Sequence, residues 1–307
     1  MNPIIKKLKN ELSRAVVGQE VMIDGLIMGL ICDGHILIEG VPGLAKTTTI
    51  NALSKAIGLE SKRIQFTPDL LPSDIIGAEI YNPQNHTFSI KKGPLFTHLL
   101  LADEINRAPA KVQSALLEVM QERQVTIGDE TFPISSPFLV MATQNPIEQE
   151  GVYPLPEAQL DRFMMKIIVS HNSQADELEI MRKSATKSFE SIRAVISIEE
   201  IETLQKELID IHVDKEIEIY MVKLISATRE PTDNIMFGAS PRASIDLYRA
   251  SSARALLNNK KFVSPDDIAS VLHSVLRHRI VLSYQARAKG VTTDEIITQI
   301  LESVPIP

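Results

Sequence analysis

The chain has 307 residues, of which 44% are hydrophobic and 23% are charged. These fractions resemble those of globular proteins, so extensive disorder and fibrous folds are excluded. The formal charge of -7 and the pI of about 5.6 argue against a globally basic nucleic-acid-binding protein. No apolar segment approaches the roughly 20 residues that cross a bilayer. The single cysteine, Cys32, cannot form an intrachain disulfide, and we therefore expect a cytoplasmic protein of one or two domains.

The first half of the chain alternates short apolar segments with helical patterns, which is typical of a parallel α/β sheet. Segments rich in Ile, Leu, Val and Phe predict strands buried on both faces, over residues 35–39, 63–67, 99–103, 137–142 and 163–169. Helices are predicted over 46–57 and 109–123, where apolar residues recur about once per turn. Together these segments predict a core of parallel strands flanked by helices.

Two segments interrupt this alternation with the pattern of β-hairpins. Segment 78–92 has turn-forming residues between β-prone flanks, and segment 124–134 is centred on Gly128 and Asp129. We expect both hairpins to be insertions that project from the sheet.

Beyond about residue 188 the strand patterns stop, and helices are predicted over 198–211, 213–228, 241–258 and 265–278. The chain is therefore expected to divide into an α/β core, residues 1–188, and a smaller all-helical domain, residues 189–307. The charged group Arg277, His278 and Arg279 is interpreted as a solvated helix end.

A glycine-rich segment joins the first predicted strand to the following helix and reads G-V-P-G-L-A-K-T over residues 40–47. It nearly matches the phosphate-binding pattern G-x-x-x-x-G-K-[ST]. Main-chain N–H groups at such a helix N-terminus bind anions. ATP is therefore expected to be held by Gly40, Val41, Pro42, Gly43, Leu44, Ala45, Lys46, Thr47 and Thr48. Within this set, Lys46 is expected to bridge the terminal phosphates and Thr47 to ligate Mg²⁺.

The phosphate loop departs from the pattern at one position, because Ala45 replaces the last glycine. A methyl group is tolerated there only if the backbone has a negative φ and the methyl does not crowd the phosphate.

Two adjacent carboxylates, Asp103 and Glu104, end the predicted strand 99–103. In phosphate-loop folds the strand beside the loop supplies an acid that organises Mg²⁺, and Asp103 fits this role. Glu104 is expected to polarise the attacking water as a general base. The alternative is an ordinary polar strand end, which the upstream phosphate loop disfavours.

Six segments resemble the MoxR family of AAA+ ATPases in sequence and in order: V-G-Q at 17–19, the phosphate loop, residues 99–123, A-T-Q-N-P at 142–146, residues 153–163 and G-A-S-P-R-A at 238–243. The resemblance runs from about residue 10 to past residue 280. It implies a P-loop AAA+ core with a helical lid domain, related to magnesium-chelatase ATPase subunits and MCM helicases. An alanine before the lysine looks like a common variant of this family.

The resemblance also implies roles for further residues. Asn145 resembles the first sensor, whose amide helps to place the attacking water. Arg162 resembles the arginine finger that reaches a neighbouring subunit's γ-phosphate, and Arg242 resembles the second sensor. Val17, Gly18 and Gln19 resemble the segment that packs against adenine in this family.

Each of these roles has a simpler alternative. Asn145 could form an ordinary Asn-Pro turn, and Arg162 could be a surface residue paired with Asp161 or Glu157. Arg242 could be simply exposed, but an arginine in a first helical turn opposes the helix dipole by ~0.3–1 kcal/mol. A bound anion, for which the γ-phosphate is the natural candidate, would reverse that penalty.

The resemblance implies an enzyme that hydrolyses ATP with Mg²⁺ in a homo-oligomeric ring, hexameric by family expectation. Hydrolysis is expected to shift the lid against the core through Arg242. MoxR relatives resemble chaperones that remodel, mature or activate protein complexes, often with a partner that carries a von Willebrand factor A domain. A separate partner of this kind and a client complex are therefore expected.

Three alternative functions remain open. A nucleic-acid motor is disfavoured by the acidic pI, and a non-hydrolysing switch is disfavoured by the pair Asp103 and Glu104. The third alternative, the motor subunit of a chelatase-like metal-insertion complex, follows from kinship with the magnesium chelatases.

Overall fold

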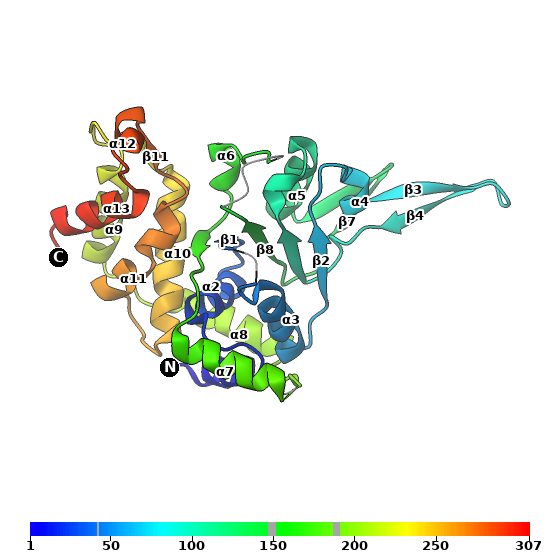
Figure 1. The fold of residues 1–307 in the computed structure, drawn as a ribbon, viewed down its shortest axis with the longest axis horizontal. Helices are drawn as coiled ribbons and strands as arrows, with labels where there is room; N and C mark the ends of the chain where they lie inside the picture. The colour runs from blue at the N-terminus through cyan, green and yellow to red at the C-terminus, as the bar shows by residue number, and fades with distance from the viewer. Residues whose placement is uncertain (42, 147–151, 187–190) are drawn as a thin grey trace.

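The computed structural model describes residues 1–41, 43–146, 152–186 and 191–307. At its centre lies a five-stranded parallel sheet with the order β2-β5-β8-β1-β9 (Figure 1). Its strands are β1 (Ile36–Glu39), β2 (Ser61–Gln65), β5 (Leu99–Asp103), β8 (Leu139–Gln144) and β9 (Met165–Ile168). Each strand overlaps one of the five predicted segments, which confirms the parallel α/β core.

Helices cover both faces of this sheet, as the strand β5 shows. Leu99 and Leu101 belong to one apolar cluster together with residues of α1, α2 and α3, whereas Leu100 and Ala102 belong to a second cluster together with residues of α5. Successive strand side chains point to opposite faces, so a strand between two helical layers reads as a continuous apolar run. The helices of the core are α1 (Pro3–Leu12), α2 (Glu20–Ile31), α3 (Lys46–Ile57), α4 (Pro72–Ile76), α5 (Ala110–Glu122), α6 (Glu157–Leu160) and α7 (Gln174–Ala185).

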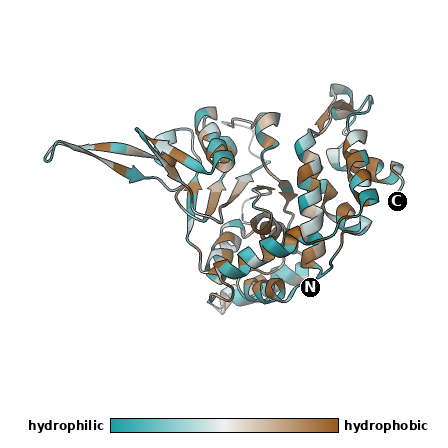
Figure 2. Cartoon of the chain, turned by 180° about the vertical axis from the view of Figure 1, so that it is seen from behind, coloured by the Kyte–Doolittle hydropathy of each residue, from teal (hydrophilic) through white to brown (hydrophobic). Residues whose placement is uncertain are grey.

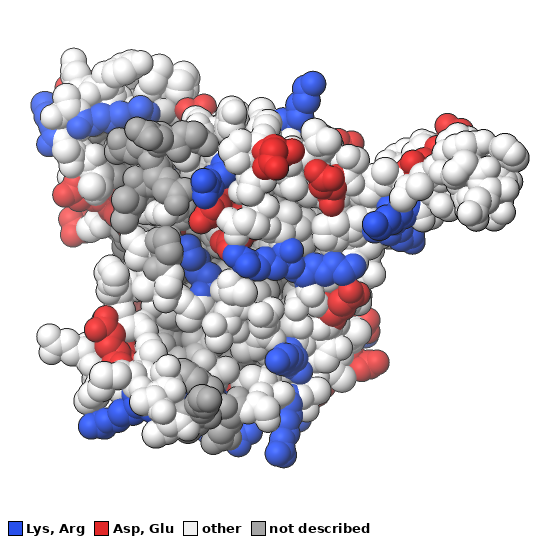
Figure 3. All heavy atoms as spheres, turned by 45° about the vertical axis from the view of Figure 1, so that its right-hand side comes forward, with Lys and Arg blue, Asp and Glu red and all other residues white. Residues whose placement is uncertain are grey.

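Both predicted hairpins are present as antiparallel pairs: β3 (Gly77–Asn82) with β4 (Thr87–Lys92), and β6 (Gln124–Ile127) with β7 (Glu130–Pro133). The β3–β4 hairpin stands clear of the body of the molecule (Figures 1 and 3). At its base, the Lys92 ammonium lies 4.8 Å from the ring centroid of Phe96 and 4.5 Å from that of Phe132. The contact with Phe132, a residue of β7, joins the two hairpins.

The C-terminal part is mainly helical, as predicted, with α8 (Ile198–Ile209), α9 (Lys215–Ala227), α10 (Pro241–Leu257), α11 (Pro265–Leu276), α12 (Tyr284–Ala288) and α13 (Thr293–Ser303). Serine, aspartate or threonine caps most of these helices, and the predicted cap Ser240 accepts from the N–H of Arg242 at 3.1 Å. Apolar residues mark the central strands in Figure 2, whereas the projecting hairpin is mostly hydrophilic. None of the described helices combines the length and apolarity of a bilayer-spanning segment.

The prediction of an all-helical domain was wrong in one detail. Strand β10 (Ile235–Phe237) pairs antiparallel with β11 (Val281–Leu282). Two strands of three and two residues are too short to leave an alternating pattern in the sequence.

The division at residues 188 and 189 remains a prediction, because α8 is also tied to the first helices of the core. The Gln205 amide donates to the Leu30 carbonyl at 3.1 Å, and the Asn2 amide donates to Glu207 at 3.0 Å.

The interpretation of residues 277–279 as a solvated helix end was wrong for two of the three residues. His278 and Arg279 are each only 6% exposed. Because the chain after α11 turns into the junction between lid and core, both side chains donate hydrogen bonds to the Phe163 carbonyl. A run of three basic residues gives no hint of such burial in the sequence.

A second buried histidine, His35, precedes β1. Its Nδ1 accepts from the N–H of Val140 at 3.1 Å, so Nε2 carries the proton and donates to the Met120 carbonyl at 3.1 Å. Burial lowers the pKa of His35 to about 3, and the nearby Arg123 charge adds to this effect. The folded protein therefore keeps His35 neutral at pH values where the unfolded chain binds a proton.

This shift predicts acid sensitivity with a defined sign. Between the unfolded pKa of about 6.5 and the folded value, the unfolded state binds more protons, so stability falls as the pH falls. We expect His35 to contribute a loss of about 2 kcal/mol in unfolding free energy between pH 7.5 and pH 5, measured by urea titration. His35→Gln does not titrate and should show a correspondingly shallower pH dependence. Equal pH dependence in the two proteins would contradict the prediction.

Candidate functional site

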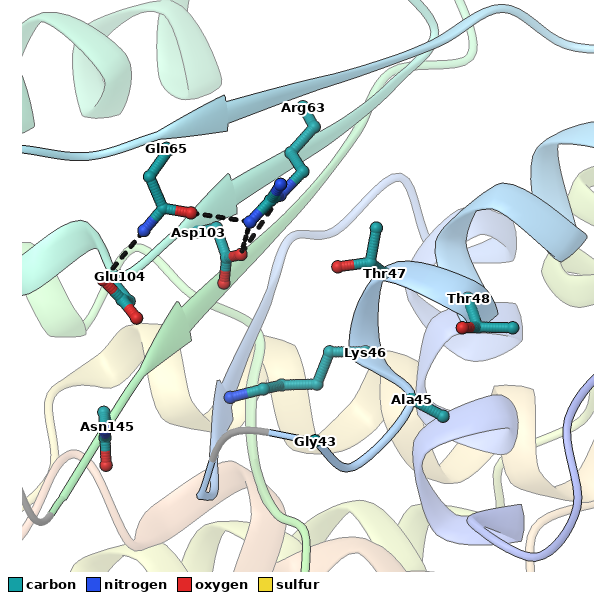
Figure 4. A pocket seen from close by; sticks show the side chains of 10 residues that line it. All are labelled: Gly43, Ala45, Lys46, Thr47, Thr48, Arg63, Gln65, Asp103, Glu104 and Asn145. Carbon is teal, nitrogen blue, oxygen red and sulfur yellow. Dashed lines mark hydrogen bonds and ion pairs between the residues drawn. The ribbon is translucent and has the colours of Figure 1, made fainter. Parts of the chain in front are cut away.

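A cavity of about 390 Å³ opens where the carboxyl ends of the central strands meet the phosphate loop. This volume lies within the range of ~300–1,000 Å³ that is usual for ligand sites. Strand ends of this kind are where open α/β sheets bind ligands. The cavity is lined by Gly43, Ala45, Lys46, Thr47, Thr48, Arg63, Gln65, Asp103, Glu104 and Asn145 (Figure 4). Eight of these ten residues were predicted from the sequence.

The phosphate loop provides the cationic and main-chain side of the cavity. Helix α3 begins at Lys46, so the unpaired N–H groups of its first turn face the loop. The Lys46 ammonium donates to the Gly40 carbonyl at 2.9 Å. Burial lowers the pKa of Lys46, while the Asp103 and Glu104 carboxylates oppose this shift. These groups are suited to binding a phosphate chain.

Glycine is required at two positions of the loop. Gly43 has a φ of 87°, which side-chain-bearing residues rarely adopt. A Cβ atom on Gly40 would lie 2.8 Å from the Val169 carbonyl oxygen. Val41 and Leu44 are partly and fully buried beside them, and the predicted loop residue Pro42 lies outside the described residues.

Ala45 does not have the negative φ that was expected for a residue with a methyl group at this position of the loop. Its φ is 57°, in the left-handed region. The turn from the loop into α3 requires this conformation at its last residue, whichever side chain stands there. The methyl group then costs roughly 1–2 kcal/mol relative to a right-handed conformation.

Ala45→Gly should therefore raise the unfolding free energy, by up to about 1 kcal/mol once the greater freedom of glycine in the unfolded chain is subtracted. Urea unfolding measures this effect. The same change at Ala52, in the interior of α3, should instead destabilise the protein by about 1 kcal/mol or more. A loss of stability at position 45 equal to that at position 52 would contradict the assignment of strain.

Asp103 is held at the end of β5 by two neighbours. Its Oδ1 accepts from the Thr143 hydroxyl at 2.6 Å, and its Oδ2 accepts from the Arg63 guanidinium at 2.7 Å. Each carboxylate oxygen has two acceptor positions. Oδ1 keeps one of them for a further ligand, whereas Oδ2 also accepts from the Arg63 Nε at 3.2 Å. With the Thr47 hydroxyl on the same cavity, the oxygen donors fit Mg²⁺.

Glu104 is engaged in two contacts within the cavity. Its Oε2 accepts from the Gln65 amide at 2.8 Å and from the Arg107 guanidinium at 3.0 Å. Its backbone has a φ of 56°, a conformation that costs a bulky residue energy and is concentrated at functional sites. Both contacts are made through Oε2, so accepting a proton from water through Oε1 does not require either of them to break.

Arg63 and Gln65 are the lining residues that the sequence analysis missed. They lie two positions apart on β2, and Gln65 is in register with Asp103 of β5. The sequence did contain a sign of them. Polar side chains alternate along this strand, although it was expected to be buried on both faces, and such a pattern indicates a site at the strand end.

The predicted adenine segment does not line this cavity but is fixed to the chain after β9. The Gln19 amide donates to the Ser170 carbonyl at 3.1 Å and to the Asn172 side chain at 2.5 Å. The Asn172 amide donates in turn to the Val17 carbonyl at 3.4 Å, and Gly18 has a φ of 69°. An adenine role for residues 17–19 remains a prediction.

Arg162 and Arg242 lie together in a separate hollow of about 300 Å³, to which Asp246 and Arg249 also contribute. The Arg162 guanidinium donates to the Leu117 carbonyl at 2.9 Å. Among the described residues, neither predicted arginine lines the phosphate-loop cavity. The structure therefore groups Arg242 with Arg162, and not with the phosphate loop of its own chain.

Comparisons with known proteins agree with this architecture. Residues 35–165 match the ATPase family associated with various cellular activities (AAA), and residues 230–300 match the AAA lid domain. The chain is 46% identical over 305 residues to chaperone MoxR1 of Mycobacterium tuberculosis, which covers 97% of this chain and 81% of that protein. It is 41% identical over 308 residues to the uncharacterised protein YeaC of Bacillus subtilis, which covers 100% and 96% of the two chains.

A solved structure shows the same fold over nearly the whole length. The crystal structure of a protein from Cytophaga hutchinsonii that is proposed to be an ATPase superposes with a TM-score of 0.93 at 49% identity, covering 99% of this chain and 95% of that one. The comparisons thus cover both the core and the lid. This chain belongs to the MoxR family of AAA+ ATPases and is an ATPase.

Proposed function

We propose that this ATPase works as a homo-oligomeric ring, hexameric by family expectation, that uses ATP hydrolysis for chaperone-like remodelling or activation of a partner protein complex. One observation carries the proposal. The phosphate loop and the acidic pair lie in one cavity, whereas Arg162 and Arg242 lie in another. A single subunit therefore holds an incomplete site, and a neighbour's arginines complete it.

The residues divide the chemistry between them. Lys46 and the loop amides hold the phosphates of ATP, and Asn145 orients the water that Glu104 deprotonates. Thr47 and Asp103 would hold Mg²⁺, which would neutralise phosphate charge. Arg162 and Arg242 of the neighbouring subunit stabilise the charge that develops on the transferred phosphoryl group.

The name of one relative and the family resemblance support a protein client. The relative named chaperone MoxR1 is similar to this chain over 97% of the chain's length. The MoxR resemblance further implies a separate partner protein that carries a von Willebrand factor A domain. We place the assembly in the cytoplasm, in keeping with the free thiol of Cys32.

Affinity purification of Glu104→Gln with ATP tests this function, because the variant should hold the assembled state with its partners bound. ADP in place of ATP is the matched control. We expect a protein partner and a client complex that are captured with ATP and lost with ADP, and ATPase activity per subunit that rises with protein concentration. Capture of no protein would contradict the chaperone function. A captured porphyrin-binding subunit would support the chelatase alternative, and salt-sensitive stimulation by DNA would support a nucleic-acid motor.

A further inference from the structure

A buried guanidinium joins the segment that carries Arg162 to the lid helix that carries Arg242. The side chain of Arg279 is 1% exposed, and its Nε donates to Asp161 Oδ1 at 2.8 Å. Its Nη2 donates to a carboxylate oxygen of Asp246. Asp161 directly precedes Arg162, and Asp246 lies one turn after Arg242 on α10. One side chain therefore contacts both arginine-bearing segments.

Main-chain contacts hold the Arg162 segment on both sides. The Arg279 Nη2 also donates to the carbonyl oxygens of Asp161 and Phe163, at 3.2 and 2.8 Å. His278 Nε2 donates to the same Phe163 oxygen at 2.9 Å. The backbone of Arg162 is thus fixed immediately before and after the residue, which sets the direction in which its side chain enters the hollow.

The Asp161 carboxylate, which binds Arg279, also links the Arg162 segment to the start of α10. Asp161 Oδ2 accepts from the Ser240 hydroxyl at 2.8 Å, and the Ser240 Oγ accepts from the N–H of Arg242 at 3.1 Å. Asp161 therefore binds both Arg279 and the cap of the helix turn that contains Arg242.

The neighbouring Arg277 also forms an ion pair, but its partners do not adjoin Arg162 or Arg242. It contacts Asp294 of α13 at 3.0 Å and the Lys166 carbonyl of β9 at 3.4 Å. In contrast, both carboxylate partners of Arg279 adjoin an arginine of the hollow, and Asp246 lines that hollow itself.

We infer that Arg279 is a positioning residue that fixes Arg162 and Arg242 as one unit, which each subunit presents to the ATP of its neighbour. The inference rests on the proposed function, because it requires a site shared between subunits. It also means that α10 moves together with the Arg162 segment, so any motion of the lid against the core does not occur at this junction.

Arg279→Lys tests the inference because lysine keeps the charge but lacks the planar fork that reaches two carboxylates and the carbonyls together. A displacement of about 1 Å in a catalytic group can cost on the order of 10²-fold in rate. We expect kcat per assembled subunit to fall about tenfold to a hundredfold, with KM for ATP unchanged, since the residue does not serve its own nucleotide. Arg277→Lys, the matched control, should keep kcat. An unchanged kcat in Arg279→Lys would overturn the inference.

Mixed oligomers separate positioning from a general structural role. An Arg279→Lys subunit keeps its own Glu104, and beside a Glu104→Gln subunit it receives correctly held arginines. Mixing these two variants should therefore restore turnover. No restoration in this mixture, while Arg162→Ala mixed with Glu104→Gln does recover, would overturn the inference and leave the proposed function intact. Failure of both mixtures would reject the shared site and the inference with it. If Arg279→Lys does not fold, Asp246→Asn takes its place with the same expected outcomes.

Discussion

Replacing Glu104 with glutamine should lower kcat for ATP hydrolysis by about 10²–10⁴-fold, the usual contribution of a general base. Glutamine keeps the size of the side chain and can still accept from Gln65 and Arg107 through its amide oxygen, but it cannot take a proton from water. ATP affinity should change little, because the phosphates are held by the loop and Lys46 on the other side of the cavity.

Steady-state turnover and binding of a fluorescent ATP analogue together measure this separation of binding from catalysis. Glu302→Gln, an exposed carboxylate on α13, is the control and should retain full activity. A Glu104→Gln protein that turns over ATP within a few-fold of the unmodified chain would assign the base to another residue.

Arg162→Ala should cost about 10³-fold or more in kcat, the magnitude expected when a guanidinium that stabilises transferred phosphoryl charge is removed. The residue lines a hollow apart from the phosphate loop, so the variant should bind ATP normally. The effect should appear in kcat and not in KM, because the contact forms with the charge of the transition state.

Sedimentation of the same samples must show that the oligomer persists, so that a loss of rate is not a loss of assembly. Arg182→Ala, on the exposed face of α7, removes an arginine elsewhere on the core and should leave turnover unchanged. Equal activity of Arg162→Ala and the control would remove Arg162 from the mechanism.

The parts of the fold that depend on long periodic patterns could be predicted from the sequence. The five buried strands and the helices α3, α5, α8, α9, α10 and α11 were found because burial on both faces, or on one helical stripe, repeats over many residues. The 12-residue helices α2 and α7 were not predicted. The pair β10 and β11 was missed because its strands are too short to repeat any pattern.

The site was predictable where a local motif carries the chemistry and less so where the fold brings distant residues together. Lys46, Thr47, Asp103 and Glu104 follow from loop and strand-end patterns, whereas the contacts of Arg63 and Gln65 depend on which strand lies beside β5. The burial of Arg279 likewise arises from packing between lid and core, which no local pattern records.

Complementation between two inactive variants is the most direct measurement of whether the ATP site is shared between subunits. Arg162→Ala keeps Glu104, and Glu104→Gln keeps Arg162, so a mixed oligomer contains some sites that have both groups. The account predicts that mixing the two proteins recovers a substantial fraction of wild-type turnover, peaking near equal proportions. A mixture that stays as inactive as its components, although light scattering shows that the subunits co-assemble, would contradict it.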